Sequence, residues 1–82
     1  MRYILFVKEA CPYCKMAADL LEEKGLDYSQ VVFEKGQEEV LEQIKSAHNW
    51  KTVPMIFCRE GSSIDFIGGY TDLAGCVGDA RE

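Results

Sequence analysis

Short apolar runs separated by polar breaks indicate four strands. Residues 2–7 are β-branched and aromatic, which is typical of a buried strand, and residues 28–33 form a second run that ends in two valines and a phenylalanine. Residues 55–59 and 63–67 are two further short runs, joined by a Glu-Gly-Ser segment that predicts a hairpin. The longest early apolar run is far shorter than the roughly 18 residues that a membrane span needs.

The segments between these strands have apolar residues at helical spacing, which predicts helices there. The first helix is expected between Pro12, which suits a first turn, and Gly25, which suits a helix end. Its apolar face contains Met16, Ala17, Leu20 and Leu21. The second helix is expected after Gly36, with acidic residues at its positive end and an apolar stripe formed by Val40, Leu41, Ile44 and Ala47.

A third, weak helix is expected near the end of the chain. Gly68 and Gly69 close the hairpin, and Thr71 and Asp72 start the helix as N-cap and first-turn acid. Gly75 and Gly78 lie within the predicted helix, and each costs about 1 kcal/mol relative to alanine. The order β-α-β-α-β-β-α predicts the α/β class, with one mixed four-stranded sheet flanked by three helices.

The size and charge of the chain exclude several classes of function. The 82 residues are expected to form one domain, 1–82, and 48% of them are hydrophobic, a globular value. The net charge is −5 and no cluster of basic residues is present, so we expect no binding of nucleic acid or of a membrane surface. No secretion signal is recognised, and the cysteine usage favours a reducing compartment, which predicts a cytoplasmic protein.

The strongest chemical signal is the motif Cys11-Pro12-Tyr13-Cys14 at the predicted junction of strand and helix. Cys11 falls at the N-cap, where unpaired N–H groups and the helix dipole favour a thiolate, and Lys8 can add a positive charge. Cys14 lies nearly one turn further inside the helix, close enough to form a disulfide with Cys11. The motif therefore predicts a redox pair in which Cys11 attacks and Cys14 resolves.

A structural zinc site is the alternative use of this pair. Such a site needs four ligands, and only Cys58, Cys76 and His48 are available besides the motif. None of these is arranged as a second ligand pair, so we expect no metal. Cys58 on a strand and Cys76 on the last helix are interpreted as small hydrophobic residues.

Three motifs together resemble a dithiol glutaredoxin. They are Cys11-Pro12-Tyr13-Cys14 with Lys8 before it, Thr52-Val53-Pro54, and Gly68-Gly69-Tyr70-Thr71-Asp72, in the family's order over most of the chain. The resemblance implies the thioredoxin-like fold, which has the same element order as the one predicted above. It also implies that Pro54 is cis, and that the backbone of Val53 pairs with glutathione as with an added strand.

The resemblance further implies a set of glutathione-binding residues. The N–H groups of Thr71 and Asp72 would hold the γ-glutamyl carboxylate, and the Asp72 side chain would hold the α-amino group. Lys51 would meet the glycyl carboxylate, and Tyr13 would flank the ligand. The implied set is Lys8, Tyr13, Lys51, Thr52, Val53, Pro54, Gly69, Thr71 and Asp72.

The implied activity is glutathione-dependent thiol–disulfide exchange. Glutathione is the co-substrate, and the acceptors are protein disulfides and glutathionylated proteins, with ribonucleotide reductase among the acceptors that the resemblance implies. The protein is expected to be a monomer. Two other functions compete with this one. A redoxin reduced by thioredoxin reductase would lack the Thr71-Asp72 pair, and Pro12 disfavours a carrier of a [2Fe–2S] cluster ligated by Cys11 and glutathione.

Overall fold

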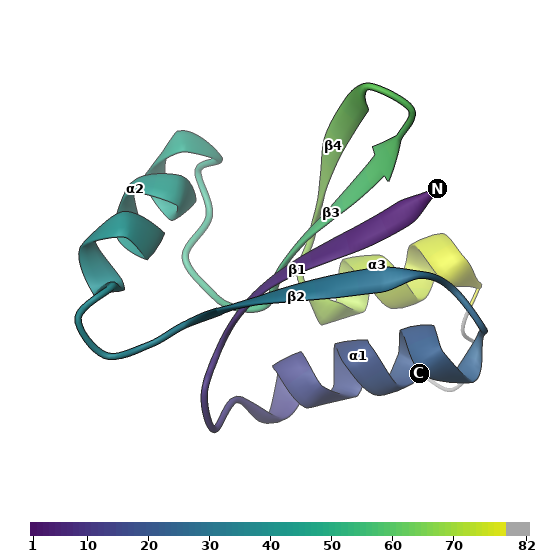
Figure 1. Ribbon diagram of the computed structural model, residues 1–82, viewed down its shortest axis with the longest axis horizontal. Helices are drawn as coiled ribbons and strands as arrows, with labels where there is room; N and C mark the ends of the chain where they lie inside the picture. The colour runs from purple at the N-terminus through teal and green to yellow at the C-terminus, as the bar shows by residue number, and fades with distance from the viewer. Residues whose placement is uncertain (79–82) are drawn as a thin grey trace.

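The computed structural model describes residues 1–78 and has the predicted order of strands and helices (Figure 1). Within these residues, the sheet has four strands in the order β2-β1-β3-β4. The elements are β1 (Arg2–Lys8), α1 (Pro12–Glu23), β2 (Tyr28–Phe33), α2 (Glu38–Ala47), β3 (Met55–Glu60), β4 (Ser63–Gly68) and α3 (Tyr70–Val77).

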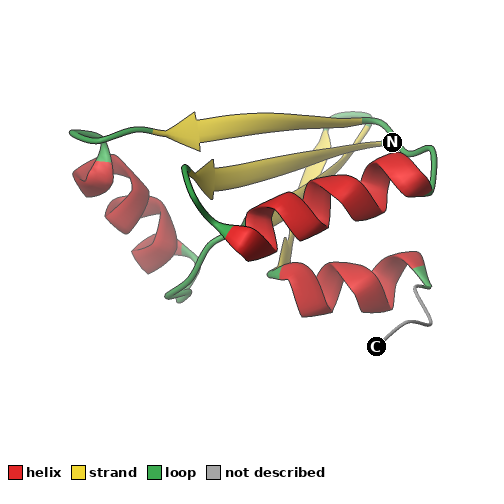
Figure 2. Cartoon of the chain, turned by 90° about the horizontal axis from the view of Figure 1, so that it is seen from below, coloured by secondary structure: helices red, strands yellow, loops and turns green. Residues whose placement is uncertain are grey.

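The sheet is mixed, as its connections predict. β1 is parallel to β2, which is reached through α1, and antiparallel to β3, whereas β3 and β4 form the antiparallel hairpin. β1 and β3 are therefore the central strands, and β2 and β4 are the edges. α1 and α3 lie side by side on one side of the sheet, and α2 stands apart from them (Figures 1 and 2). The predicted α/β architecture is confirmed.

Successive side chains of β1 point to opposite faces of the sheet and so divide the core into two clusters. Leu5 and Val7 point to the face covered by α1 and α3, where they join Leu20, Leu21 and Leu73 in a cluster of nearly inaccessible side chains. Ile4 and Phe6 point to the opposite face and pack against a smaller cluster of Leu41, Met55 and Phe57. Burial on both faces explains why β1 is almost continuously apolar.

Three apolar positions of the predicted helix faces prove to be solvent-exposed. Met16 in α1 is 42% exposed, Val40 in α2 is 52% exposed, and Ala47 at the end of α2 is exposed as well, so the predictions that they face the core were wrong. In α1, Cys14 and Ala18 are buried instead. In α2, the neighbour of Val40, Leu41, is fully buried and anchors the helix to the sheet.

The last helix begins and ends differently from the prediction. Gly69, not Thr71, is the N-cap, and Tyr70 is the first helical residue. Gly78 lies just past the helix with a left-handed backbone (φ 73°), where its N–H binds the carbonyl of Ala74. Gly78 therefore ends the helix instead of weakening it, because glycine adopts this conformation without a Cβ clash.

None of the helices found within residues 1–78 is long and apolar enough to cross a membrane.

We predict that Leu41→Ala destabilises the protein by about 2–5 kcal/mol, because it removes the fully buried contact of α2 with the second core cluster. The adjacent Val40→Ala is the matched control, since Val40 lies on the exposed side of the same helix turn. Urea unfolding followed by circular dichroism measures both values. Equal losses for the two variants would contradict this account of how α2 is attached.

Candidate active site

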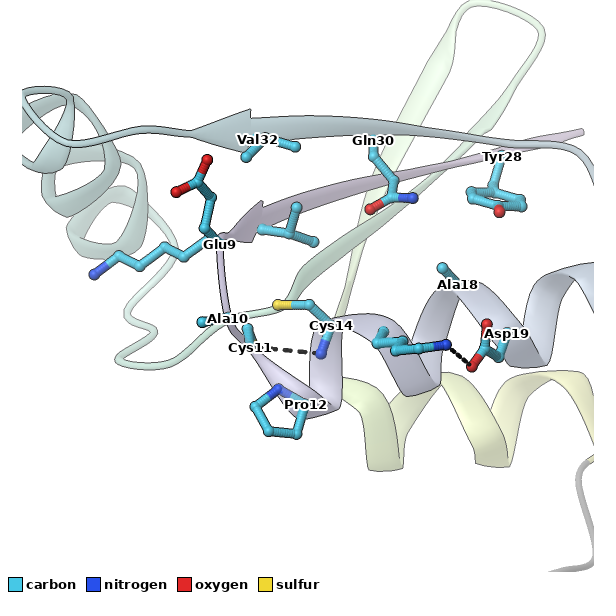
Figure 3. Close-up of a pocket in the computed structure, with 13 residues that line it drawn as sticks. Glu9, Ala10, Cys11, Pro12, Cys14, Ala18, Asp19, Tyr28, Gln30 and Val32 are labelled. Carbon is cyan, nitrogen blue, oxygen red and sulfur yellow. Dashed lines mark hydrogen bonds and ion pairs between the residues drawn. The ribbon is translucent and has the colours of Figure 1, made fainter.

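The Cys11 side chain caps the N-terminus of α1. β1 ends at Lys8, and a turn with Ala10 in a left-handed conformation (φ 55°) brings Cys11 to the N-cap position. The Cys14 N–H donates a hydrogen bond to Cys11 Sγ across 3.3 Å, the contact dashed in Figure 3. A sulfur atom in this position faces the positive end of the helix, which favours the thiolate.

The second cysteine of the motif has a different environment. Cys14 is only 4% exposed and belongs to the main core cluster. Burial, followed by the side-chain hydrogen bond with Cys11, raises the pKa of Cys14 to about 12. Cys14 therefore remains a protonated thiol at neutral pH. Cys11 is therefore the more accessible of the two sulfur atoms and Cys14 the sheltered one. The roles of attacking and resolving thiol stay a prediction.

The loop before β3 lies against the motif. The Val53–Pro54 peptide bond is cis, as the resemblance implies. The Cys11 thiol points at the Val53 carbonyl, with 4.0 Å between Sγ and the oxygen. This contact joins residues 42 positions apart in the sequence and brings the Thr52-Val53-Pro54 segment next to the reactive pair.

A hollow of about 330 Å³ opens beside this loop. Three segments meet there: the motif with Tyr13, the loop before β3, and the N-terminus of α3. Seven of the predicted glutathione-binding residues line it: Tyr13, Thr52, Val53, Pro54, Gly69, Thr71 and Asp72.

The two predicted lysines lie outside this hollow. Lys8 lines a separate depression with Glu38. The pKa of Glu38 is lowered mainly by backbone N–H groups of Glu38 and Gly36, and Lys8 adds a smaller electrostatic contribution. Lys51 lines another depression with Glu42 and Lys45. The structure thus does not bring Lys8 or Lys51 together with the other seven residues.

The Asp72 carboxylate has a structural contact that the sequence analysis did not foresee. Its Oδ2 accepts a hydrogen bond from the Gly69 N–H at 3.0 Å and so caps α3. Gly68 immediately precedes this cap with φ 129°, and a Cβ atom there would collide with the Asp72 carboxylate. Gly68 is therefore required where the chain passes close to Asp72, whereas a Cβ atom at Gly69 would make only ordinary contacts.

Two aromatic residues of the hollow were not among the predicted site residues. Tyr70 lies with its ring centroid 6.1 Å from that of Tyr13, and Trp50 packs edge-on against Phe66 at 5.2 Å. Both line the hollow. The signal for Tyr70 was its place between Gly69 and Thr71 in the third motif, whereas no local pattern pointed to Trp50.

Comparison with known proteins identifies the relatives of this chain. The family model described as Glutaredoxin matches residues 4–62. The chain is 34% identical to glutaredoxin 1 of Escherichia coli, an alignment that covers 94% of this chain and 93% of that protein. It is also 32% identical to the hybrid peroxiredoxin hyPrx5 of Haemophilus influenzae over 84% of this chain, but it spans only 26% of that longer protein.

A similar fold is found among solved structures. The crystal structure of a wheat glutaredoxin matches with a TM-score of 0.80 at 21% identity, and covers 96% of this chain and 71% of that one. At this identity the likeness concerns the fold, which is confirmed as thioredoxin-like.

The raised pKa of Cys14 predicts site-selective alkylation. Between neutral pH and about pH 9, iodoacetamide should modify Cys11 but leave Cys14 intact, because only a thiolate reacts at an appreciable rate. Peptide mapping by mass spectrometry of the reduced protein measures each site, and the exposed Cys76 serves as the reference for an accessible thiol. Labelling of Cys14 as fast as that of Cys76 would contradict the prediction.

Proposed function

Because the chain belongs to the glutaredoxin family, a family of thiol–disulfide oxidoreductases, we propose that it is a glutathione-dependent oxidoreductase with Cys11 and Cys14 as its redox pair. The observation that carries this proposal is the geometry of the pair. Cys11 Sγ lies at a helix N-terminus and accepts the Cys14 N–H at 3.3 Å, while Cys14 itself is a buried thiol.

The proposed reaction starts with a glutathionylated protein. The Cys11 thiolate attacks the glutathione sulfur, the mixed disulfide bond breaks, and the protein leaves as a thiolate that takes up a proton. A second glutathione thiolate then attacks the glutathione sulfur on Cys11 and releases oxidised glutathione and reduced Cys11. A leaving sulfur that is stabilised as a thiolate at the helix N-terminus favours this second step.

A protein disulfide follows a longer route. Attack by Cys11 forms a mixed disulfide with the substrate and releases one substrate thiol. Cys14 then loses its proton and attacks Cys11 Sγ, which releases the second substrate thiol and forms the Cys11–Cys14 disulfide. Two glutathione molecules reduce this disulfide and become one molecule of oxidised glutathione.

The hollow beside Val53 supports glutathione as the co-substrate. One of its lining residues, Val53, has its carbonyl oxygen 4.0 Å from Cys11 Sγ. The first turn of α3 also lines the hollow, and N–H groups at a helix N-terminus favour a carboxylate. We assign the γ-glutamyl carboxylate to the N–H groups of Thr71 and Asp72, and the α-amino group to the Asp72 carboxylate. An oxygen that caps Gly69 can also accept from an ammonium group, because a carboxylate has about four lone-pair positions.

The acceptors are protein disulfides and glutathionylated proteins, with ribonucleotide reductase as a candidate. We propose that residues 1–82 act as one domain, as a monomer in the cytoplasm.

Cys14→Ser tests the division of labour between the two cysteines. We expect this variant to retain reduction of a glutathione mixed disulfide, because that route uses Cys11 alone, and to lose reduction of a protein disulfide. Oxidation of NADPH in a coupled assay with glutathione and glutathione reductase measures both rates. Cys11→Ser is the control and should lose both; if the wild type is inactive with glutathione, the proposed function is wrong.

The Asp72→Asn variant separates the effect of the Asp72 charge from the effect of its hydrogen bond with the Gly69 N–H. The amide oxygen can still accept the Gly69 N–H, so we expect nearly unchanged stability, whereas loss of the negative charge should raise the KM for glutathione about two- to fivefold. Asp72→Ala should raise this KM and also lower the free energy of unfolding by about 1 kcal/mol. An unchanged KM in Asp72→Asn would remove the proposed contact with the α-amino group.

A further inference from the structure

A second and larger groove lies on the other side of the Cys11–Cys14 pair. It has a volume of about 840 Å³ and runs between α1 and the edge strand β2 (Figure 3). Cys11, Cys14 and Pro12 line one end of it, and Tyr28 lines it as well. It shares no lining residue with the hollow assigned to glutathione.

The groove exists because β2 is an edge strand that α1 does not cover. Gln30 pairs with Leu5 and Val32 pairs with Val7 in the sheet register, so both point to the α1 side. Facing them, α1 presents the small side chain of Ala18. Val32 accordingly remains 45% exposed although it faces the helix layer.

The chemistry of the groove suits an extended peptide. Val32, which is 45% exposed, provides the accessible apolar surface, and the buried side chains of Val7 and Ala18 form the floor beneath it. The Gln30 side chain points from β2 toward α1 (Figure 3). The carboxamide of Gln30 has two donors and an acceptor, so it can bind both the N–H and the C=O of a peptide backbone. Four charged residues line the groove, two of each sign. Lys15 and Asp19 on α1 pair with each other at 3.0 Å, and Lys8 and Glu9 add one positive and one negative charge. The groove therefore offers apolar contact and backbone hydrogen bonding, without a strong preference for charge.

We propose that this groove binds the polypeptide segment of a protein substrate that flanks its reactive cysteine. Cys11 is a lining residue of the groove, and a substrate sulfur must reach Cys11 Sγ for exchange to occur. With glutathione on the Tyr13 and Val53 side, the β2 side remains free for the protein chain. The inference rests on thiol–disulfide exchange at Cys11, which is part of the proposed function, but not on the use of glutathione.

The occupant is a segment with an apolar residue near its cysteine. That side chain packs on Val32 and Ala18, while the backbone of the segment binds the Gln30 carboxamide. If one medium-sized apolar side chain of the substrate is buried in the transition state of attack, the burial corresponds to about a tenfold gain in the rate of attack.

A glutathione-free reaction tests this inference. The substrates are two synthetic peptides whose cysteine carries thionitrobenzoate as a mixed disulfide, one with leucines beside the cysteine and one with glycine and serine. Cys11 attacks the cysteine sulfur, a new disulfide forms between Cys11 and the peptide, and thionitrobenzoate leaves with the bonding electrons. Its absorbance measures the rate. Cysteine carrying the same group measures the reactivity of Cys11 without a peptide.

The reaction is run in a Cys14→Ser, Cys76→Ser background, so that neither a resolving thiol nor the exposed Cys76 contributes. Val32→Glu places a charge in the groove. Val31→Glu is its matched control, because Val31 is 42% exposed on the same strand but pairs with Phe6 on the opposite face. Adding Cys11→Ser should abolish the release and so identifies the reacting sulfur.

We expect the leucine peptide to react about tenfold faster than the glycine–serine peptide, each relative to free cysteine. Val32→Glu should remove this advantage and Val31→Glu should retain it. Equal rates for the two peptides, or equal effects of the two glutamates, would overturn the groove as a substrate site. Inactivity with glutathione alongside a retained leucine advantage would refute the proposed co-substrate and leave the groove standing.

Discussion

The hydrogen bond from the Cys14 N–H to Cys11 Sγ, 3.3 Å long, determines the arrangement of the active site. It places the Cys11 sulfur at the N-terminus of α1, while Cys14 lies three residues further along the same helix, on its buried side. The Cys11 sulfur thereby faces the positive end of the helix dipole, while burial raises the pKa of the Cys14 thiol. A single turn of helix thus produces two chemically different sulfur atoms from two identical side chains.

The central strand provides the support for this turn. β1 pairs with both β2 and β3, so its end at Lys8 is fixed relative to the loop before β3 and to the edge strand. Cys11 consequently lies between two recesses, the hollow at Val53 and the groove at Val32. In the proposed mechanism these recesses separate the two partners of the exchange, because a tripeptide and a polypeptide chain approach the same sulfur from different sides.

The third helix combines structural and binding roles at its first turn. The Asp72 carboxylate caps the Gly69 N–H, and residues of the same turn line the hollow. The close approach of Asp72 to Gly68 leaves no room for a side chain there. The requirement for glycine at this position is therefore set by the cap itself, and it holds whether or not a ligand is bound.

The sequence by itself determined the element order, the sheet class and the position of the cysteine motif at the start of α1. These features depend on local spacing: alternation in β1, a proline in the first turn of α1, and two cysteines three residues apart. Distances along one turn of helix are the same in every protein. The position of Cys11 at the N-cap could therefore be predicted without knowledge of the rest of the fold.

Only the tertiary structure decided which apolar residues are buried and which site residues meet. Met16 and Val40 carry the right residue type but lie where no other element covers them, since burial depends on the neighbouring layer. Lys8 and Lys51 are next to the motifs in sequence yet lie outside the hollow, whereas Trp50 and Tyr70 line it. The groove beside β2 is likewise absent from any local pattern, because it results from a helix that leaves the sheet edge uncovered.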